Sequence, residues 1–347
     1  MATIDMRSDT VTLPTPEMRR AIAEARIGDD VYSEDPTINR LEALAAEKVG
    51  KEAAVLVVSG TMGNLCALLA HSARGDEAIV GDESHIYNYE AGGASVLGGV
   101  VFHPIRNAPN GELPLGALAA AIRDPSDSHS APTRLIGLEN THNRCGGVVL
   151  APEYMRTVHH FAREQGLVVH LDGARLFNAA VALGLDAREI ARHADSVMFC
   201  LSKGLSAPVG SILAGEGAFV ARARRVRKLV GGGMRQAGII AAAGIVALDQ
   251  MVERLAEDHA NARLLAEGLA SFAQIAIDLA MVQTDIVIFE LRDERWSAES
   301  FVRALAEGGL LVGGMGAGRI RAVTHYGIDA GDVEEALEIV RVVLNNS

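Results

Sequence analysis

Short continuous apolar runs recur along the first two thirds of the chain, separated by turn-rich or helical segments. These runs have the length of strands and lie at residues 53–58, 99–102, 135–138, 167–169, 197–199 and 209–214. Runs that are apolar at every position are typical of strands buried on both faces of a parallel sheet. Their alternation with helical segments predicts an α/β domain with an open, mostly parallel sheet.

The pattern changes after a long apolar helical region at residues 237–272. The elements that follow alternate between strand and helix, at residues 285–291, 298–308, 319–324 and 330–344. They predict a small α+β lobe. We therefore expect an N-terminal arm, a large domain and a small C-terminal domain, at residues 1–14, 15–250 and 251–347.

Two of the buried strands are followed by a charged residue. The segment GLVVHLDGAR brings Asp172 to the end of one strand, and SVMFCLSKG brings Lys203 to the end of the next. The carboxyl ends of parallel strands meet at one edge of the sheet, where α/β proteins bind ligands. A lone aspartate there is more often a helix N-cap, and a lone lysine is more often solvated. Together, however, they suit a cofactor held as a Schiff base.

A third feature of the same sheet edge is the segment SGTMGN, which follows the strand at residues 53–58 and leads into a helix. Residues 59–63 can direct backbone N–H groups and a helix N-terminus at an anion. The spacing GxxxxGK[ST] of nucleoside triphosphate sites is absent. A Gly-Thr turn after a strand is common in itself, so this signal gains value only from its combination with Asp172 and Lys203.

Composition narrows the range of functions. The 347 residues carry a net charge of −12, which opposes binding to a nucleic acid backbone. No stretch approaches the ~20 apolar residues of a membrane span, and the N-terminus lacks the basic start and apolar run of a secretory signal. Three cysteines without CxxC spacing suit a reducing compartment and offer no zinc site. We expect a cytoplasmic protein with no bound metal.

The three features of the sheet edge together indicate pyridoxal phosphate as a cofactor. Its phosphate needs backbone donors such as those of residues 59–63, its pyridine nitrogen needs a carboxylate such as Asp172, and its aldehyde needs an amine such as Lys203. An aromatic or imidazole ring should cover one face of the cofactor. His85, in a loop after a strand, is the candidate for this position.

The residues also carry a resemblance to a known family. Nine segments occur in order between residues 5 and 325, and they read DMRSDTVTLPTPEM, DDVYSEDPTINRLE, SGTMGN, ESHIYNYEAGG, LENTHN, HLDGARLFNA, LSKGLSAPVGS, GGGMRQ and RAVTH. This set resembles the threonine aldolases, which are pyridoxal phosphate enzymes of fold type I, the aspartate aminotransferase-like fold. The resemblance covers nearly the whole chain. One departure is Ser33, where the family pattern has glycine.

The resemblance implies cofactor-binding roles for several residues. Lys203 would form the Schiff base, Asp172 would pair with the pyridine nitrogen, and His85 would stack on the ring. The phosphate would be held by the residues of the glycine turn, Ser59, Gly60 and Thr61.

The resemblance also implies a carboxylate clamp and a base. Arg175 and Arg321 would bind the substrate carboxylate with help from Ser8, because a guanidinium group matches a carboxylate in geometry. Either arginine could instead be a surface or ion-paired residue. A base must take the proton of the substrate β-hydroxyl, and His142, or His85 acting through water, is suitable because histidine titrates near neutral pH. The sequence leaves the choice between the two open.

Members of this family are homotetramers whose sites form at a dimer interface. By resemblance, Arg235 and Lys228 would reach the phosphate of a neighbouring subunit, and Tyr32 would line a neighbour's pocket. Each could equally be an interface or surface residue without such a contact. Arg175 is expected to contact the cofactor as well as the substrate.

The reaction implied by the resemblance is the cleavage of L-threonine, L-allo-threonine and other β-hydroxy-α-amino acids to glycine and an aldehyde. A serine hydroxymethyltransferase or an aminotransferase is the alternative within the same fold type. A nucleotide-binding oxidoreductase loses support because the GxGxxG fingerprint is missing. A non-catalytic binding protein would leave Lys203 unexplained. The sequence leaves the preference between threonine and allo-threonine open.

Overall fold

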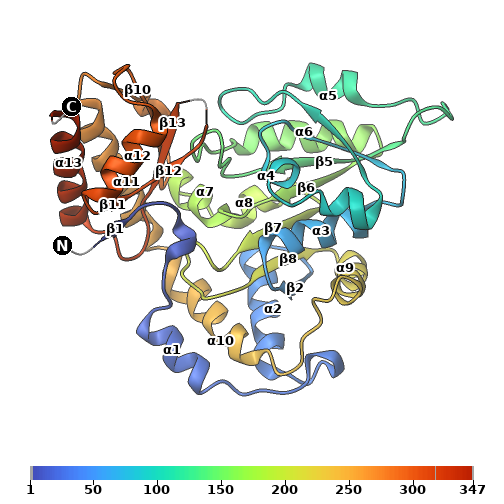
Figure 1. The fold of residues 1–347 in the computed structure, drawn as a ribbon. Helices are drawn as coiled ribbons and strands as arrows, with labels where there is room; N and C mark the ends of the chain where they lie inside the picture. Colours follow the sequence, from blue (N-terminus) through green and yellow to red (C-terminus); the bar gives the residue numbers. More distant parts are fainter. Residues whose placement is uncertain (1–2, 317, 346–347) are drawn as a thin grey trace.

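The computed structural model describes residues 3–316 and 318–345, which form a large domain around a seven-stranded sheet and a smaller C-terminal lobe (Figure 1). The strands of the large sheet lie in the order β2-β8-β7-β6-β5-β3-β4. The block from β7 to β4 is parallel throughout, whereas β8 is antiparallel to both β7 and β2. The strand bounds are β2 Ala53–Val57, β3 Glu77–Gly81, β4 Val101–Ile105, β5 Thr133–Glu139, β6 Val168–Asp172, β7 Ser196–Cys200 and β8 Ser211–Gly215. The predicted α/β class with a mostly parallel sheet is confirmed.

Successive side chains of the sheet strands enter two different layers of the core. Val55 and Leu213 pack with residues of α3 and α9, whereas their neighbours Leu56 and Ile212 belong to the larger core on the opposite face. The two layers follow from the period of two along a strand, and because both faces are covered, the strands are apolar at every position. The covering helices are α2 Pro36–Val49, α3 Gly60–His71, α5 Leu115–Ala121, α6 Pro152–Glu164, α7 Leu176–Leu183, α8 Ala187–Ala191 and α9 Gly217–Leu229.

The two N-terminal helices begin where their sequences predict. The side chains of Thr15 and Asp35 accept hydrogen bonds from backbone N–H groups of the first turn of α1 (Pro16–Ala23) and of α2. Each cap is followed by a proline, whose fixed backbone angle suits the first helical position. The first helix ends at Ala23.

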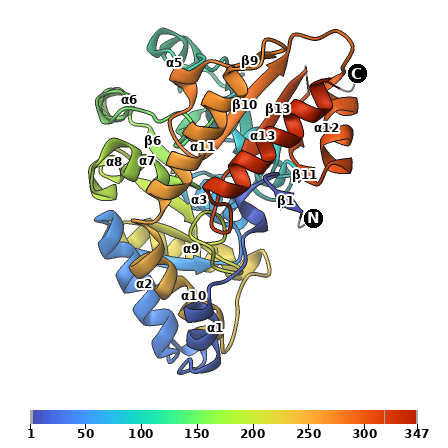
Figure 2. The same ribbon diagram turned by 90° about the vertical axis from the view of Figure 1, so that its left-hand side faces the viewer.

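The helical region predicted at residues 237–272 is broken into three pieces. These are α10 (Gly238–Val246), a π-helical segment η4 (Ala247–Met251) and α11 (Leu255–Ala270). The first piece packs against α1 and α2 of the large domain, whereas α11 packs against α13 of the small lobe (Figure 2). The break is therefore where the chain passes from the large domain to the small lobe.

The small lobe is built on an antiparallel sheet with the strand order β12-β13-β10-β9. Figure 2 shows α11 and α13 side by side over this lobe. Its remaining elements are β9 Ile275–Ala276, β10 Ile286–Leu291, α12 Ala298–Glu307, β12 Gly313–Gly314, β13 Arg319–Val323 and α13 Ala330–Asn345. A separate apolar core of its own fills the space between the sheet and the helices.

The N-terminal segment, expected to be an extended arm, connects the two domains. Its strand β1 (Ile4–Asp5) pairs in parallel with β11 (Leu310–Leu311) of the small lobe, and Met6 is buried in the core of that lobe. Further along, the hydroxyl group of Thr12 donates a hydrogen bond of 3.1 Å to the backbone carbonyl of Lys203. The residues between these two contacts therefore run past the carboxyl edge of the large sheet.

Several elements differ from the sequence prediction. His85, expected in a loop after a strand, begins a single helical turn, α4 (His85–Asn88), and α3 begins at Gly60, inside the segment expected to be a turn. The two-residue strands β1, β9, β11 and β12 were not predicted because no periodicity can show in so short a run. Helices α7 and α8 were not predicted either. Within the described residues, no helix is long and apolar enough to cross a membrane.

Candidate active site

A cavity of about 340 Å³ lies between the carboxyl ends of β5, β6 and β7 and the small lobe. It is lined by six residues that the sequence predicted, Ser8, His85, Asp172, Arg175, Lys203 and Arg321. Its other lining residues are Thr10, Tyr89, Glu139, Thr141, Asn143, Ala174, Gly313, Gly314 and Met315. The fold thus brings together polar side chains from both ends of the sequence.

Asp172 is the last residue of β6, and its side chain is fixed on both oxygens. Oδ1 accepts a hydrogen bond of 3.1 Å from the backbone N–H of Ala174, and Oδ2 accepts one of 2.8 Å from Nδ2 of Asn64 in α3. The residue is buried, with 3% of its surface exposed. A carboxylate held in this way keeps one direction, as the partner of a pyridine nitrogen must.

Lys203 lies in the loop after β7, and its side chain lines the cavity. The loop is fixed by hydrogen bonds to the backbone carbonyl of Lys203 from the N–H of Ser206, at 2.8 Å, and from the hydroxyl of Thr12. Within the part of the chain that the structure describes, no carboxylate forms an ion pair with the ammonium group. The amine is therefore available to a ligand.

His85 is held at the cavity by two carboxylates. Its backbone N–H donates to Oε2 of Glu139 at 2.7 Å, and its Nδ1 lies 3.0 Å from Oε1 of Glu90. Burial, the largest effect on this imidazole, lowers its pKa, but the hydrogen bond to Glu90 and the negative charges of Asp172 and Glu139 outweigh burial and leave the pKa raised. The neighbouring carboxylates therefore favour the protonated form of the ring.

Arg175 is already engaged with carboxylates of the protein. Its Nε and Nη2 donate to the two oxygens of Asp9 at 2.8 and 2.7 Å, and its Nε lies 3.7 Å from Asp285. Burial would raise the pKa of Asp9, but the charge and hydrogen bonds of Arg175 lower it to about 2. Much of the guanidinium charge is therefore neutralised before any ligand binds.

Arg321 differs from Arg175 because its partners are neutral. Nη1 donates to Oδ1 of Asn143 at 2.7 Å, and Nη2 donates to the backbone carbonyl of Arg7 at 3.1 Å. Among the described residues no carboxylate pairs with it, and burial lowers the pKa of the guanidinium group. A partly buried guanidinium group whose direct hydrogen-bond partners are neutral favours binding of an anionic group such as a carboxylate.

His142 does not line the cavity, although its neighbours Thr141 and Asn143 do. Its side chain is buried, with 1% of its surface exposed, and packs close to Gly111. Neither ring nitrogen has a hydrogen-bond partner among the described residues. The loop after β5 thus presents Thr141 and Asn143 to the cavity and buries His142 beside Gly111.

The predicted phosphate cradle forms the N-terminus of α3. The hydroxyl group of Ser59 caps this helix by accepting a hydrogen bond of 3.2 Å from the N–H of Met62. A Cβ atom on Gly60 would come within 2.9 Å of Sγ of Cys200, so glycine permits the close approach of the helix to the end of β7. Ser59, Gly60 and Thr61 are not among the residues that line the 340 Å³ cavity. Gly60 nevertheless lies beside Cys200, which precedes Lys203 by three residues in the sequence.

Tyr32 and Arg235 do not line the cavity of their own chain. The tyrosine is 72% exposed. The arginine side chain is exposed as well, and its Nη1 lies 3.3 Å from Oδ2 of Asp29. Their expected contacts with a neighbouring subunit therefore stay predictions.

Comparison with known proteins decides the family. Residues 5–293 match the family described as beta-eliminating lyase. The chain is 47% identical over 340 residues to low-specificity L-threonine aldolase 1 of Arabidopsis thaliana, a match that covers 97% of this chain and 95% of the relative. It is 50% identical over 295 residues to the low specificity L-threonine aldolase of Escherichia coli K12, with 85% and 86% covered. The chain belongs to the threonine aldolase family.

Solved structures agree with this assignment at the level of the fold. A threonine aldolase of Leishmania major superposes with a TM-score of 0.83 at 20% identity, covering 98% of this chain and 99% of the other. A serine palmitoyltransferase of Sphingomonas wittichii gives a TM-score of 0.74 at 19% identity, covering 99% and 88%. The predicted family and the predicted fold class are both confirmed.

Several polar residues that contact the predicted site residues Arg175, Asp172 and His85 were not predicted from the sequence. They are Asp9, Asn64, Glu90 and Glu139. Glu139 ends β5 beside Asp172, its register partner at the end of β6, so the rule that identified Asp172 could have identified it. The others lie within the quoted motifs, but a motif does not reveal which side chains meet in space.

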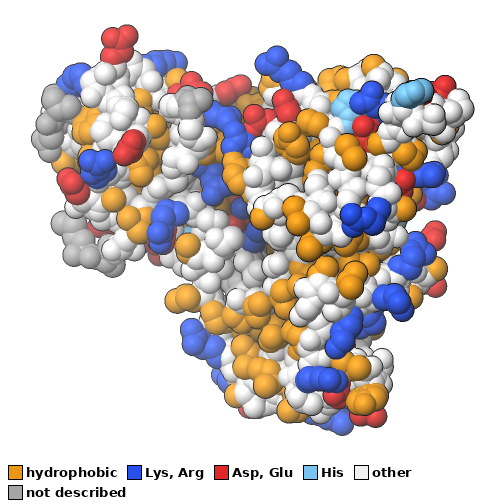
Figure 3. Space-filling view, turned by 45° about the vertical axis from the view of Figure 1, so that its right-hand side comes forward, with side chains coloured by type: hydrophobic (Ala, Val, Ile, Leu, Met, Phe, Trp, Pro, Cys, Tyr) orange, Lys and Arg blue, Asp and Glu red, His pale blue; other side chains and the backbone are white. Residues whose placement is uncertain are grey.

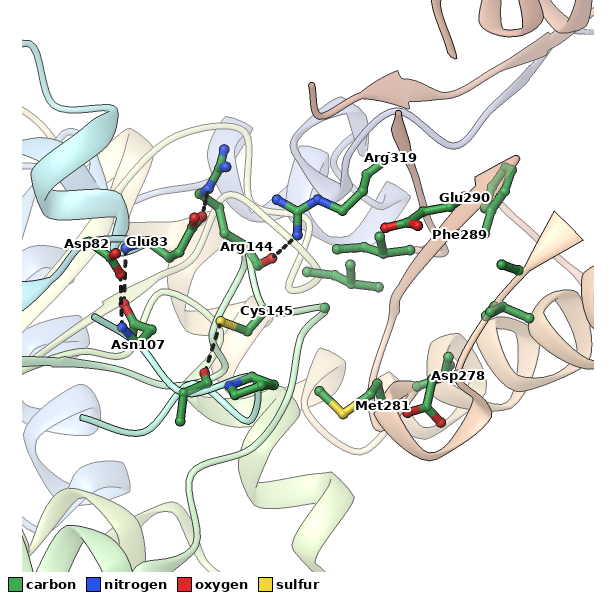
Figure 4. Close-up of a pocket in the computed structure, with 18 of the residues that line it drawn as sticks. Asp82, Glu83, Asn107, Arg144, Cys145, Asp278, Met281, Phe289, Glu290 and Arg319 are labelled. Atoms are coloured by element: carbon green, nitrogen blue, oxygen red, sulfur yellow. Dashed lines mark hydrogen bonds and ion pairs between the residues drawn. The ribbon is translucent and has the colours of Figure 1, made fainter. Parts of the chain in front are cut away.

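A second and larger cavity, of about 830 Å³, lies nearby between loops of the large domain and β10 of the small lobe (Figure 4). Arg144 lines this larger cavity, and its guanidinium group bonds both to Glu83, which also lines it, and to the hydroxyl group of Tyr89, which lines the smaller cavity. Figure 4 shows Arg319 reaching toward the backbone carbonyl of Arg144, at 3.5 Å. None of the predicted catalytic residues lines this larger cavity.

Proposed function

We propose that this chain is a pyridoxal phosphate-dependent carbon–carbon lyase. It cleaves L-threonine, L-allo-threonine and other β-hydroxy-α-amino acids to glycine and an aldehyde. One observation carries the proposal, namely that an amine without an ion pair, Lys203, shares a cavity with the fixed carboxylate of Asp172 and with the guanidinium group of Arg321. The names of the curated relatives, low-specificity L-threonine aldolases, support the choice of substrate.

The residues of the cavity fit the cofactor. Lys203 offers the amine for the aldehyde, and Asp172 offers the carboxylate for the pyridine nitrogen. Ser59, Gly60 and Thr61 offer backbone donors for the phosphate at the start of α3, where any larger side chain at residue 60 would meet Cys200. When bound, pyridoxal phosphate supplies a protonated ring that accepts the electron pair of the bond that breaks.

Arg321 holds the substrate carboxylate, with Ser8 beside it. Both residues line the cavity, and the guanidinium group has no competing carboxylate among the described residues. Arg175 also lines the cavity, but two of its N–H groups already donate to Asp9. We therefore expect it to contribute less than Arg321 to binding of the substrate carboxylate. The clamp fixes the substrate so that its Cα–Cβ bond can be oriented for cleavage.

His85 is our candidate for the base that takes the β-hydroxyl proton, directly or through a water molecule. It lines the cavity, whereas His142 does not. Its raised pKa, which results from Glu90 and the nearby carboxylates overcoming burial, matches a group that exchanges protons near neutral pH. His142 thereby loses most of its support for this role.

We further propose a cytoplasmic homotetramer in which Tyr32 and Arg235 serve the site of a neighbouring subunit. Large apolar side chains remain exposed on the single chain, among them Leu13, Val96 and Leu229. Figure 3 shows apolar side chains gathered over the lower half of one face. Exposed apolar patches of this kind favour protein contacts. The three free cysteines, of which two are buried, suit a reducing compartment.

The test is aldehyde release by cofactor-loaded protein from L-threonine and, separately, from L-allo-threonine. We expect release from both, and the ratio of the rates gives the stereochemical preference. If neither gives aldehyde although cofactor is bound, the aldolase proposal fails. Transfer of the amino group to a keto acid, or a requirement for tetrahydrofolate, would then identify an aminotransferase or a hydroxymethyltransferase.

A further inference from the structure

Glu90 is a buried carboxylate that the proposed reaction leaves without a task. It follows α4, and 7% of its surface is exposed. Its Oε1 accepts a hydrogen bond of 2.8 Å from Nδ2 of Asn64 and lies 3.0 Å from Nδ1 of His85. Burial raises the pKa of Glu90, and a buried carboxylate is costly unless its partners hold it. Its position therefore calls for an explanation.

The orientation of Asn64 follows from its two carboxylate neighbours. Its Nδ2 lies 2.8 Å from Glu90 and 2.8 Å from Asp172. Ionised carboxylates only accept hydrogen bonds, so the two N–H groups of the amide must point at them. The amide oxygen then faces Nε2 of His170 at 3.1 Å, and this nitrogen must carry the proton.

A neutral hydrogen-bonded chain behind Asn64 fixes this arrangement. Nδ1 of His170 lies 2.9 Å from the hydroxyl group of Ser196, which lies 2.8 Å from Nε2 of His71. Burial lowers the pKa of both imidazoles to about 3, so both are neutral at physiological pH. With Nε2 of His170 protonated, its Nδ1 accepts from Ser196, and Ser196 accepts from His71. All the donors of this hydrogen-bonded series thus point toward Glu90 and Asp172, and none of them is available to His85.

An ionised Glu90 can only accept hydrogen bonds, so the hydrogen between Glu90 and His85 then belongs to the imidazole. If Nδ1 of His85 carries the hydrogen, Glu90 accepts it and Nε2 keeps a free electron pair in the neutral ring. His85 also faces Asp172, Glu139 and the ring of Tyr89, whose centroid is 5.5 Å away. The cations that share its cavity are Lys203, Arg175 and Arg321.

We propose that Glu90 is a positioning residue, which accepts the Nδ1 proton of His85 and leaves Nε2 as the nitrogen that exchanges a proton in the cavity. Asn64 donates hydrogen bonds to both Glu90 and Asp172 and so fixes their relative positions. The same amide therefore orients the positioning residue of His85 and the partner of the cofactor ring. The inference rests on the proposed function for its catalytic meaning. Its structural content, the tautomer of His85, does not depend on that function. His85, Glu90 and Asp172 offer ligand atoms within 4.8 Å of one another, and these hydrogen bonds account for that grouping.

The first test uses the unaltered holoenzyme. Solid-state NMR with 15N-labelled histidine, at a pH above the pKa of His85, distinguishes a ring protonated at Nδ1 from one protonated at Nε2. The His85 signals are identified by their absence from the His85→Asn variant. We expect the Nδ1-protonated tautomer, and an Nε2-protonated neutral ring would overturn the proposal. This result stands whether or not the protein cleaves threonine.

The second test is Glu90→Gln, with Glu77→Gln as the matched control. Glu77 is also buried and lies 3.2 Å from Nδ1 of a histidine, His103, but it does not line the cavity. Loss of the Glu90 charge should lower the pKa of His85 in the NMR titration and shift the acidic limb of the kcat/KM profile to lower pH. We expect kcat to fall roughly 10- to 100-fold with cofactor absorbance retained, and both profiles to stay unchanged in the control.

A double-mutant comparison separates positioning from general loss of structure. If Glu90 acts through His85, Glu90→Gln should change kcat by less than about twofold when His85→Asn is already present. An equally large effect in both backgrounds would contradict the proposal. So would an unchanged titration of His85 in folded Glu90→Gln. If the variant fails to fold, the tautomer measured in the unaltered protein still decides.

Discussion

The two neighbouring cavities differ in the reactive groups that line them. Among its described lining residues, the larger one, of about 830 Å³, has several arginines but no lysine and no histidine. In the smaller one, of about 340 Å³, Lys203, His85 and the fixed carboxylate of Asp172 lie together. An amine, an imidazole and an oriented carboxylate that converge in one cavity point to a ligand on which they act. Volume alone would have favoured the larger cavity, where this combination is missing.

The largest expected effect comes from removing the amine that distinguishes the smaller cavity. Lys203→Ala should lower turnover of L-threonine by more than about 10³-fold, because no other lysine lines this cavity to bond with the cofactor aldehyde. The visible absorption band of the covalently bound cofactor should disappear with it. Aldehyde release and the absorption spectrum are the two measurements.

Near-normal turnover in Lys203→Ala would end the assignment. The control is Lys51→Ala, because Lys51 is a partly buried lysine that donates to the backbone carbonyl of Ala194, away from both cavities. We expect this control to change stability but to keep the cofactor band.

The next effect compares two arginines of one strand. Arg321 and Arg319 lie two residues apart on β13, but the first lines the smaller cavity and the second the larger. Arg321→Lys should raise KM for threonine roughly 10- to 100-fold, since a lysine cannot replace the planar fork that binds a carboxylate. Arg319→Lys should change KM by less than about twofold.

Steady-state kinetics on the pair decide the question. Equal effects of the two substitutions would contradict the separation of the cavities. A fall in kcat without a change in KM for Arg321→Lys would show that the arginine acts on the reaction rather than on binding of the carboxylate.

Arg175 provides a third contrast, because it pairs directly with the buried carboxylate of Asp9 and also lies 3.7 Å from the buried carboxyl group of Asp285. Burial raises the pKa of Asp285 to about 7, with Arg175 opposing this shift. An ordinary aspartate in the unfolded chain titrates near ~3.9. The stability that Asp285 contributes is therefore fully present below pH ~4 and is lost as the pH rises to about 7. Asp9, with its lowered pKa, contributes in the opposite sense, and its share is lost as the pH falls toward about 2.

Asp285→Asn should therefore flatten the pH dependence of stability. Relative to the unaltered protein, its free energy of unfolding should gain more at pH 7.5 than at pH 5, by on the order of 1 kcal/mol per pH unit across the window, and its Tm should rise in the same sense. Thermal unfolding of cofactor-loaded protein at several pH values measures this. Asp249→Asn, at an exposed side chain, should leave the profile unchanged. A parallel shift at all pH values would mean that Asp285 is ionised throughout.

Much of this site could be predicted from the sequence because it depends on strand ends. Asp172 and Lys203 follow apolar runs, and parallel strands necessarily place their carboxyl ends at one edge. Contacts between distant segments could not be predicted in that way. The pairing of Asp9 with Arg175 and the link from Asn64 to Glu90 depend on how the arm and α3 cross the sheet, which no local pattern encodes. The role of His142 stays a prediction, because the motif located the loop but not the direction of each side chain, and the imidazole does not line the cavity.

The smallest expected effect tests whether the side chain of His142 faces away from the cavity. His142→Ala should leave kcat for threonine within about threefold, because the imidazole does not line the cavity, whereas His85→Asn should lower it roughly 100-fold or more. The substitution should still destabilise the fold by roughly 1–3 kcal/mol, since it empties a buried position next to Gly111. Steady-state kinetics and thermal unfolding of both variants separate the two outcomes. A large loss of kcat in His142→Ala, with cofactor bound and stability intact, would mean that the loop turns over when substrate binds and that His142 is the base after all.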